Sequence, residues 1–239
     1  LSEPLFGFDT ESLPDERYFH KPTVQPQEPV PPALPQAFYD ACSPMIVIGQ
    51  LPEGTVTGPT LSLLRRRYAL LCEPLAIPSY DPVHIEEALT VINMLSDEPD
   101  SKSRSRRDFM PDYIIYIGDT LVSKRAKHFL QHCHPKSCVV VNASGKLTDV
   151  TMNVTDVVVC PVEDALDSLC EKLESGDVAL GNEASAFRGR WAMALDEWAI
   201  RCKVFEPAYS QMMAVRRLCE QTNGQECHMQ FANSSAVRL

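Results

Sequence analysis

Two adjacent cations, Lys124 and Arg125, occupy the start of a predicted helix, where the positive end of the helix dipole makes cations unfavourable. The segment IIYIGDTLVSKRAKHFLQ (114–131) passes from an apolar run through a glycine-containing turn into an amphipathic helix pattern. The first turn of a helix also presents backbone N–H groups that lack intrahelical partners. These N–H groups, the dipole and the two side chains would together bind an anion. A solvated basic pair without a ligand is the alternative, and the sequence leaves both open.

The last residues of the chain, FANSSAVRL (231–239), repeat this arrangement. A predicted strand, 226–232, is followed by the small polar residues Asn233, Ser234 and Ser235, and Arg238 stands four positions after Ser234. If a helix starts there, its N–H groups, the hydroxyl and the guanidinium would bind one anion. The alternative is a helix N-cap followed by an exposed arginine.

Histidines near the end of the helix that Lys124 and Arg125 begin form a possible metal site. His128 and His132 share a helix face at positions i and i+4, and Cys133 and His134 follow them. A zinc ion needs a third or fourth converging ligand, and none stands at a finger-like spacing. Histidines in a last helical turn also interact favourably with the dipole. We therefore predict that this chain provides no metal ligand.

Composition and absent motifs exclude several classes of function. The net charge of −10 argues against a nucleic-acid-binding protein, and the basic stretch SKSRSRRDF (101–109) is interpreted as a solvated loop. No apolar run approaches the about 20 residues of a membrane span. The motifs GxGxxG, GxxxxGK[ST], GxSxG and HExxH are all absent, and neither glycine-containing strand end is a dinucleotide fingerprint, so we expect no nicotinamide cofactor.

The cysteines predict the cell compartment of the protein, and the first residues predict that the chain is a fragment. The nine cysteines are odd in number, form no CxxC pair and lie mostly in apolar segments, which predicts free thiols and a cytoplasmic protein. The opening stretch LSEPLFGFDTESLPDER is acidic and contains proline, unlike a signal peptide. Because it also lacks an initiator Met, we expect the chain to be a piece of a longer protein.

Short strands and helices alternate in the first part of the chain and must position these residues. Continuous β-branched runs between helices predict a parallel sheet covered on both faces, a Rossmann-like, doubly wound α/β fold. The predicted strands are 45–50, 70–77, 112–118, 137–145 and 154–161. The predicted helices are 58–71, 81–95 (capped by Asp81), about 123–132 and 162–175.

The two ends of the chain differ from this central pattern. Residues 1–36 carry eight of the nineteen prolines and are predicted to be an extended strap or linker. Residues 37–180 form the predicted central domain. The remainder, 181–239, is predicted to be a helical appendage with a break at Pro207, followed by the first strand of a truncated domain. An apolar stripe in this appendage, formed by Trp191, Leu195 and Trp198, is typical of a core contact.

Three segments resemble, in the right order, one family of thiamine-diphosphate-dependent enzymes, the MenD synthases of menaquinone biosynthesis. LSEPLFGFDTESLP resembles the stretch that closes their pyrimidine-binding domain, and PDYIIYIGDTLVSKRAKHFL resembles part of their central domain. YSQMMAVRRLCEQTNGQECHMQFANSSAVRL resembles the entry into their cofactor domain, with its G-N-S-x-x-x-R motif. Ala232 replaces the usual glycine of that motif.

The resemblance implies that this chain is the central fragment of a transferase that joins 2-oxoglutarate, after decarboxylation on thiamine diphosphate, to isochorismate. Such an enzyme needs Mg²⁺ or Mn²⁺ and is a homodimer or homotetramer. The resemblance implies that the substrate carboxylates are bound by five residues, which are Lys124, Arg125, Asn233, Ser234 and Arg238. The activating glutamate and the metal motif belong to the flanking thiamine domains, so the isolated chain is expected to bind no cofactor and to be inactive.

Two other classes of function are compatible with the same residues. One is a stand-alone regulatory module that binds an anion or a nucleotide. The other is a purely structural spacer between the domains of another thiamine enzyme.

Overall fold

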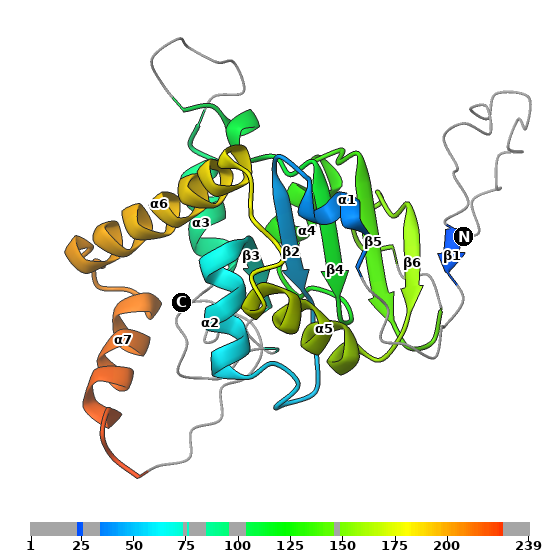
Figure 1. Ribbon diagram of the computed structural model, residues 1–239. Coiled ribbons are helices and arrows are strands. Elements are labelled where there is room, and N and C mark those ends of the chain that lie inside the picture. Colours follow the sequence, from blue (N-terminus) through cyan, green and yellow to red (C-terminus); the bar gives the residue numbers. More distant parts are fainter. Residues whose placement is uncertain are drawn as a thin grey trace, which may run out of the picture. The chain divides into compact units, whose positions relative to one another are not determined.

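A parallel sheet forms the centre of the computed structural model, which describes residues 23–25, 34–73, 76, 85–95, 104–145 and 149–226. Its six strands lie in the order β1-β6-β5-β4-β2-β3, and each neighbouring pair is parallel (Figure 1). The predicted doubly wound sheet is therefore confirmed. The strands are β1 (Thr23–Gln25), β2 (Pro44–Ile48), β3 (Ala69–Cys72), β4 (Tyr113–Ile117), β5 (Ser137–Asn142) and β6 (Asp156–Val159).

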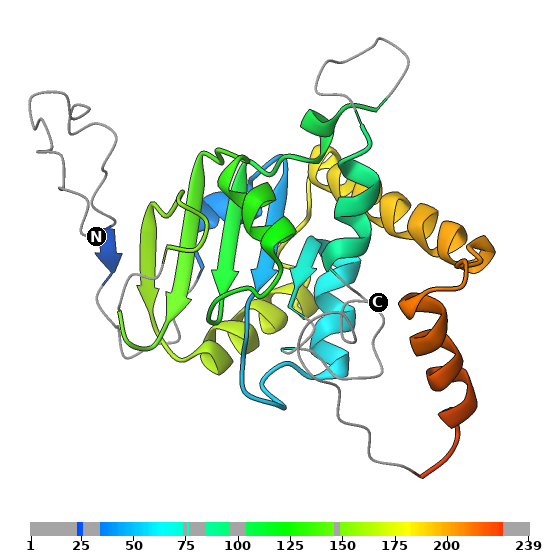
Figure 2. The ribbon, with the colours of Figure 1, turned by 180° about the vertical axis from the view of Figure 1, so that it is seen from behind.

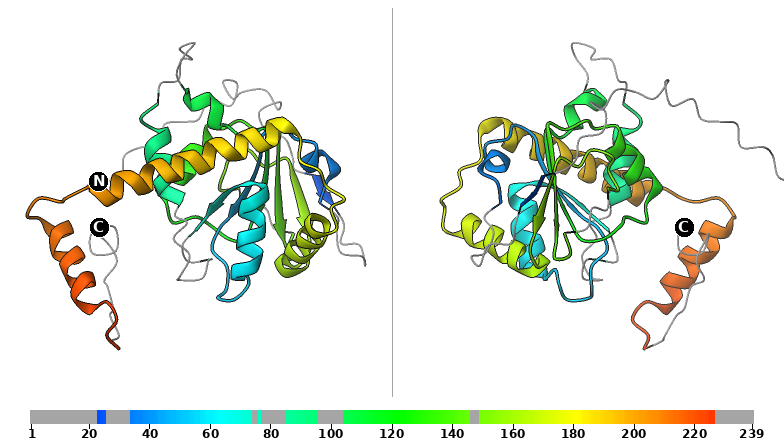
Figure 3. Two further views of the ribbon diagram at one scale, coloured as in Figure 1. Left: turned by 60° about the vertical axis from the view of Figure 1, so that its left-hand side comes forward. Right: turned by 90° about the vertical axis from the view of Figure 1, so that its right-hand side faces the viewer.

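Helices cover both faces of the sheet, as the edge-on view in Figure 3 shows. One face carries α1 (Gln36–Tyr39), α2 (Gly58–Arg67) and α5 (Val162–Glu174). The other face carries α3 (Ile85–Ile92), α4 (Lys124–Gln131) and the first part of α6 (Asn182–Val204), and is seen in Figure 2. Because both faces are covered, β2 and β4 are buried at every position, which explains their unbroken apolar sequences PMIVI and YIIYI.

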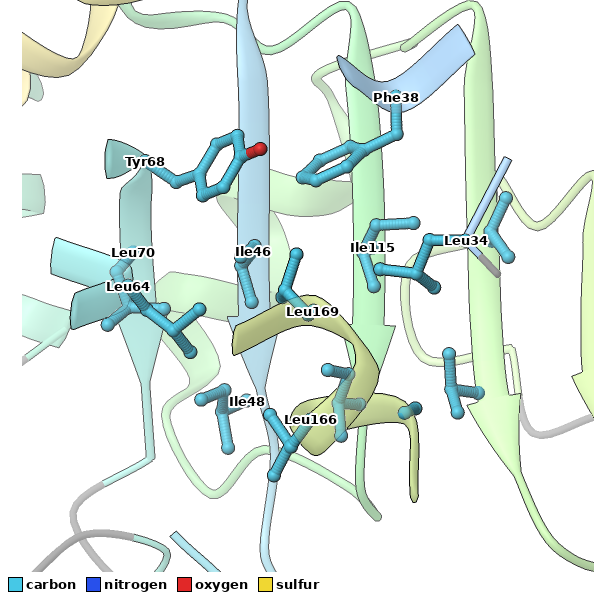
Figure 4. Packing of buried hydrophobic residues seen from close by; sticks show 14 of the residues in the cluster. Leu34, Phe38, Ile46, Ile48, Leu64, Tyr68, Leu70, Ile115, Leu166 and Leu169 are labelled. Carbon is cyan, nitrogen blue, oxygen red and sulfur yellow. The ribbon is translucent and has the colours of Figure 1, made fainter. Parts of the chain in front are cut away.

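Each face of the sheet has its own hydrophobic core. On the first face, Ile46 and Ile48 of β2 pack against Leu64 of α2 and Leu169 of α5, with Phe38 beside them (Figure 4). On the second face the apolar stripe of α6 contributes Trp191, which is 3% exposed. Its indole packs edge-on against three phenylalanines, with ring centroids 5.6–6.4 Å apart: Phe109, Phe129 and Phe187. The predicted core role of this stripe is confirmed.

The described residues fall into two compact units that divide between Trp198 and Ala199. The second unit contains the end of α6 and a further helix, α7 (Gln211–Thr222), whose N-cap Ser210 accepts a hydrogen bond from the N–H of Met213. Arg216 of α7 pairs with Glu220 at 2.9 Å and with Glu206 at 3.7 Å. The helical sequence is interrupted between Val204 and Gln211, around Pro207, as predicted.

Several element boundaries differ from the prediction. The helix predicted over 58–71 ends at Arg67, because Ala69–Cys72 continues its apolar pattern but pairs with β2 as a strand. The predicted strand over 70–77 accordingly begins earlier and ends at Cys72. The predicted cap Asp81 and the predicted strand 226–232 lie outside the described residues, except for Glu226.

The basic stretch 101–109 is not a solvated loop over its described part, residues 104–109. Residues Arg106–Phe109 form a 3₁₀ turn, η4, and the Phe109 side chain is fully buried. Arg104 pairs with Glu197 of α6 at 2.8 Å, and the carbonyl of Asp108 accepts a hydrogen bond from Arg190 at 2.8 Å. The prediction was wrong because the charge of Arg104 finds its partner, Glu197, on a helix about ninety positions away.

Candidate functional site at the carboxyl edge of the sheet

The carboxyl ends of β2 and β4 flank the point where the direction of the chain through the sheet reverses. From β2 the chain passes through α2 to β3 on one side, and then through α3, on the opposite face, to β4 on the other side of β2. Open α/β sheets bind their ligands at such a switch point, in the crevice beyond the strand ends. Gly49 follows β2 and Gly118 follows β4 at this point.

In this protein the two loops close the crevice by bonding to each other. The N–H of Gly49 donates to the carbonyl of Ile117 at 2.8 Å. The N–H of Gln50 donates to the carbonyl of Thr120 at 3.1 Å, and the N–H of Asp119 donates to the carbonyl of Gln50 at 2.9 Å. Backbone N–H groups that would bind a diphosphate at this position therefore already have acceptors.

Gly49 permits this close approach because it has no side chain. A Cβ atom at this position would lie 1.8 Å from the carbonyl oxygen of Asp119 and 2.8 Å from the hydroxyl of Tyr116. Gly118 has φ +90°, a left-handed conformation that favours glycine. Both glycines thus serve contact between two loops of the protein, and not the approach of a nucleotide.

Tyr116 of β4 holds the loop that follows β4 by a hydrogen bond from its side chain. Its hydroxyl donates a hydrogen bond to the carbonyl of Asp119 at 2.6 Å. Burial raises the pKa of the Tyr116 phenol, and the negative charges of Asp119 and Glu73 raise it further. The phenol therefore stays protonated, and stays a donor, across the physiological pH range.

Glu73, directly after β3, is the buried carboxylate of this edge. Its side chain accepts a hydrogen bond from the N–H of Val122 at 2.8 Å, and the residue is 4% exposed. Its own N–H donates to the carbonyl of Ile48 at 2.8 Å and extends the pairing of β3 with β2. We did not single out Glu73 from the sequence, although a charged residue that ends a buried strand was a usable signal.

The basic pair lies on the first turn of α4, as predicted. Ser123 is the N-cap, and its hydroxyl accepts a hydrogen bond from the N–H of Ala126 at 3.0 Å. Lys124 and Arg125 follow as the first two helical residues, and both side chains are exposed. The guanidinium of Arg125 donates to the hydroxyl of Thr90 on α3. Two cations therefore flank a capped helix start at the rim of the closed crevice.

The structure places only two of the five predicted binding residues. Lys124 and Arg125 are adjacent at the rim, whereas Asn233, Ser234 and Arg238 lie outside the described residues. Convergence of the two groups on one anion stays a prediction.

The histidines at the other end of α4 have local partners. The rings of His128 and His132 stack with centroids 4.2 Å apart, and Nδ1 of His132 lies 2.7 Å from the carbonyl oxygen of His128. The thiol of Cys133 donates to the carbonyl of Phe129 at 3.1 Å. Within the described part of the chain, no three His, Cys, Asp or Glu side chains are grouped as metal ligands.

Three curated proteins, each called 2-succinyl-5-enolpyruvyl-6-hydroxy-3-cyclohexene-1-carboxylate synthase, are similar to the chain along its full length. The protein of Bacteroides fragilis is 25% identical over 240 residues. That of Bacteroides thetaiotaomicron is 25% identical over 250 residues, and that of Phocaeicola vulgatus is 23% identical over 244 residues. The resemblance to this synthase family that the motifs indicated is confirmed.

These alignments cover the whole of this chain but only part of each relative. Each covers 100% of this chain but 40% of the relative, so the chain spans about two fifths of the length of the curated relatives that it matches. No family model matches the chain. None of the helices in the described residues is long and apolar enough to span a membrane.

Proposed function

We propose that this chain is the central portion of a 2-succinyl-5-enolpyruvyl-6-hydroxy-3-cyclohexene-1-carboxylate synthase, an enzyme that depends on thiamine diphosphate. The observation that carries the proposal is similarity over the whole chain to proteins of that name, two fifths of whose length it covers. Residues that precede and follow this portion in the full-length protein would form the two thiamine domains. The enzyme would decarboxylate 2-oxoglutarate and add the resulting carbanion to isochorismate, in the cytoplasm and as a homodimer or homotetramer.

The described residues do not fit a thiamine diphosphate site. They hold no cluster of carboxylates or histidines that would bind the Mg²⁺ or Mn²⁺ of the cofactor, and their loops close the switch point of the sheet. We therefore propose no cofactor contact for these residues. Cofactor binding and carbon–carbon bond formation belong to the flanking domains in this proposal.

The contribution of this chain would be to bind substrate carboxylates. Both substrates are dicarboxylates, and Lys124 and Arg125 present two cations at a helix N-terminus, beside N–H groups of the first turn. Cations in this position oppose the dipole in the free protein and become favourable when an anion binds between them. Asn233, Ser234 and Arg238 would complete the same pocket.

A second candidate function is that of a structural spacer, which the closed switch point favours. The loops after β2 and β4 bond to each other, so this sheet offers no nucleotide crevice, and the same closure argues against a nucleotide-binding regulatory module. A spacer and a substrate-binding domain differ in one respect: only the second needs the charge of Lys124 and Arg125.

The experiment that tests the proposal uses the full-length protein. We expect it to consume isochorismate only when 2-oxoglutarate, thiamine diphosphate and Mg²⁺ or Mn²⁺ are all present, as followed by loss of isochorismate and release of carbon dioxide. The 239-residue chain alone should give no micromolar isotherm with thiamine diphosphate and Mg²⁺ in calorimetric titration. A full-length protein without this activity, or a micromolar isotherm for the chain, would contradict the proposal.

A further inference from the structure

The loop that leads into α4 is attached to the sheet at two points. At its beginning, Asp119 and Thr120 bond to Gln50 beyond the end of β2. At its end, the N–H of Val122 donates to the carboxylate of Glu73, 2.8 Å away, beyond the end of β3. The loop thus crosses the end of the central strand β2 and is fastened to a strand on its far side.

The second attachment is built into the interior of the protein. Glu73 is 4% exposed, and between the two attachments the side chain of Leu121 is fully buried. A buried carboxylate is costly unless it has partners. Here it receives a backbone N–H one residue before the N-cap of α4, where the helix dipole favours a negative charge.

The basic pair follows this attachment within three residues. Val122, which Glu73 holds, precedes the N-cap Ser123, and Lys124 and Arg125 follow the cap directly. Arg125 has a further contact, with Thr90 of α3, whereas the described residues provide no hydrogen bond or ion pair for the Lys124 side chain. Loss of the Glu73 contact would free the loop end from which both cations extend.

We propose that Glu73 is a positioning residue for substrate binding. Its carboxylate holds the start of α4 so that Lys124 and Arg125 face the carboxylates of the substrate, and Glu73 itself does not touch the substrate. This inference rests on the proposed function, because it concerns the residues that would bind the dicarboxylates.

Substitution of Glu73 should separate substrate binding from turnover. In the full-length protein we expect Glu73→Ala to raise KM for the dicarboxylate substrates about 10- to 100-fold, since a displacement of about 1 Å costs on this order. The value of kcat should stay within about threefold, because the reacting atoms lie on the flanking domains. Glu73→Gln keeps an oxygen that accepts the N–H of Val122 and should restore most of the affinity.

Asp112 provides a matched control at the opposite edge of the sheet. It precedes β4, and its carboxylate accepts the N–H groups of Cys42 at 3.1 Å and of Ser43 at 2.8 Å. Asp112→Ala should lower thermal stability at least as much as Glu73→Ala does, because two backbone donors lose their acceptor. It should leave KM unchanged, because no residue that it contacts belongs to the basic pair.

Hydrogen exchange and kinetics together decide the inference. We expect faster exchange of the peptide that covers residues 118–126 in Glu73→Ala and ordinary exchange there in Asp112→Ala. Unchanged exchange, or equal KM in the two alanine variants, would overturn the inference while leaving the synthase assignment intact. An unaltered full-length protein without synthase activity would instead overturn the proposed function, and this inference with it.

Discussion

Arg125 carries the most direct test of substrate binding. A hydrogen bond to a charged group contributes about 1.5–3 kcal/mol, and each 1.36 kcal/mol corresponds to a tenfold change in rate. In the full-length enzyme, Arg125→Ala should therefore lower kcat/KM about 10- to 150-fold. Arg125→Lys should restore part of this, because an ammonium cannot reproduce a bidentate guanidinium. Steady-state kinetics with each dicarboxylate substrate measures both effects.

The matched control for Arg125 lies two residues further along α4. Lys127→Ala removes a cation from the same helix but not from the basic pair at its start, and should leave kcat/KM within about twofold. The melting temperature should change little in either variant, because Arg125 is exposed and opposes the dipole. A large fall in melting temperature with unchanged kcat/KM would show that Arg125 serves the structure and not the substrate.

The residues of the site differed in how far they could be predicted. The basic pair was found from local signals, namely an apolar strand, a glycine turn and a helix pattern within one short segment. Glu73 was missed because its partner, Val122, stands 49 positions away, and no local period reports such a contact. Gly49 lies within the predicted strand 45–50, but its role depends on the approach of Asp119 from another loop.

Helix α6 is the element whose contribution to stability is most sharply defined. Trp191 is 3% exposed and packs against three phenylalanines of the second core, whereas Met193 on the same helix is 60% exposed. We expect Trp191→Ala to lower the free energy of unfolding by about 3–5 kcal/mol, because it leaves a cavity in a packed core. Met193→Ala should change it by less than about 0.5 kcal/mol.

Urea denaturation of the two alanine variants measures this difference. Equal unfolding midpoints would mean that α6 does not pack on the sheet as described. A fall for Trp191→Ala of less than about 1 kcal/mol would have the same meaning, since truncation of a buried tryptophan costs more in a core of ordinary density.

The predicted elements were accurate where the sequence pattern is local. The five strands from β2 to β6 all overlap their predicted ranges, because each is a short apolar run that lies between the two covered faces of the sheet. The boundary between α2 and β3 was misplaced because apolar residues continue through it. Only the pairing of Ala69–Cys72 with β2, a tertiary contact, ends the helix there.

At the scale of the whole molecule, buried thiols and phenols make stability depend on alkaline pH. Burial raises the pKa of Cys138 to about 12 and that of Cys160 to about 11, from an ordinary value of 9.0. Burial likewise raises the pKa of Tyr39 and of Tyr113 from 10.0 to about 12. The unfolded chain thus loses these protons at a lower pH than the folded chain does.

The sign of the effect follows from this difference. At a pH between the unfolded and the folded pKa of a group, the folded state binds more protons than the unfolded state. The contribution of these groups to the free energy of unfolding is therefore fully present below about pH 9 and is lost as the pH rises towards 12. The loss is about 1.4 kcal/mol per pH unit for each group. We expect the urea midpoint to be level from about pH 7 to 8.5 and to fall above about pH 9. The urea midpoint of Cys138→Ala should fall less steeply with pH. A midpoint of the unaltered protein that stays level up to about pH 11 would contradict the prediction.

The layered architecture could be predicted from the sequence, but the full set of strands in its sheet could not. Alternating helices and β-branched runs predict a covered parallel sheet, and this is what the protein forms. β1 was missed because it contains only three residues, Thr23–Gln25, inside a proline-rich segment that reads as a strap. Its strand character comes from pairing with β6, which follows far later in the chain.

The pairing of β1 with β6 also has a consequence for the order of folding. Thr23 pairs with Asp156, 133 positions further along the chain. At about 5–20 residues per second, a ribosome completes β6 several seconds or more after β1 has emerged. β1 therefore cannot pair until β6 has been synthesised. Until β1 pairs with β6, the N–H and C=O groups along the outer edge of β6 can form hydrogen bonds with other chains. Proline on both sides of β1 limits the mispairing of this segment during that interval, because proline cannot donate to a β ladder.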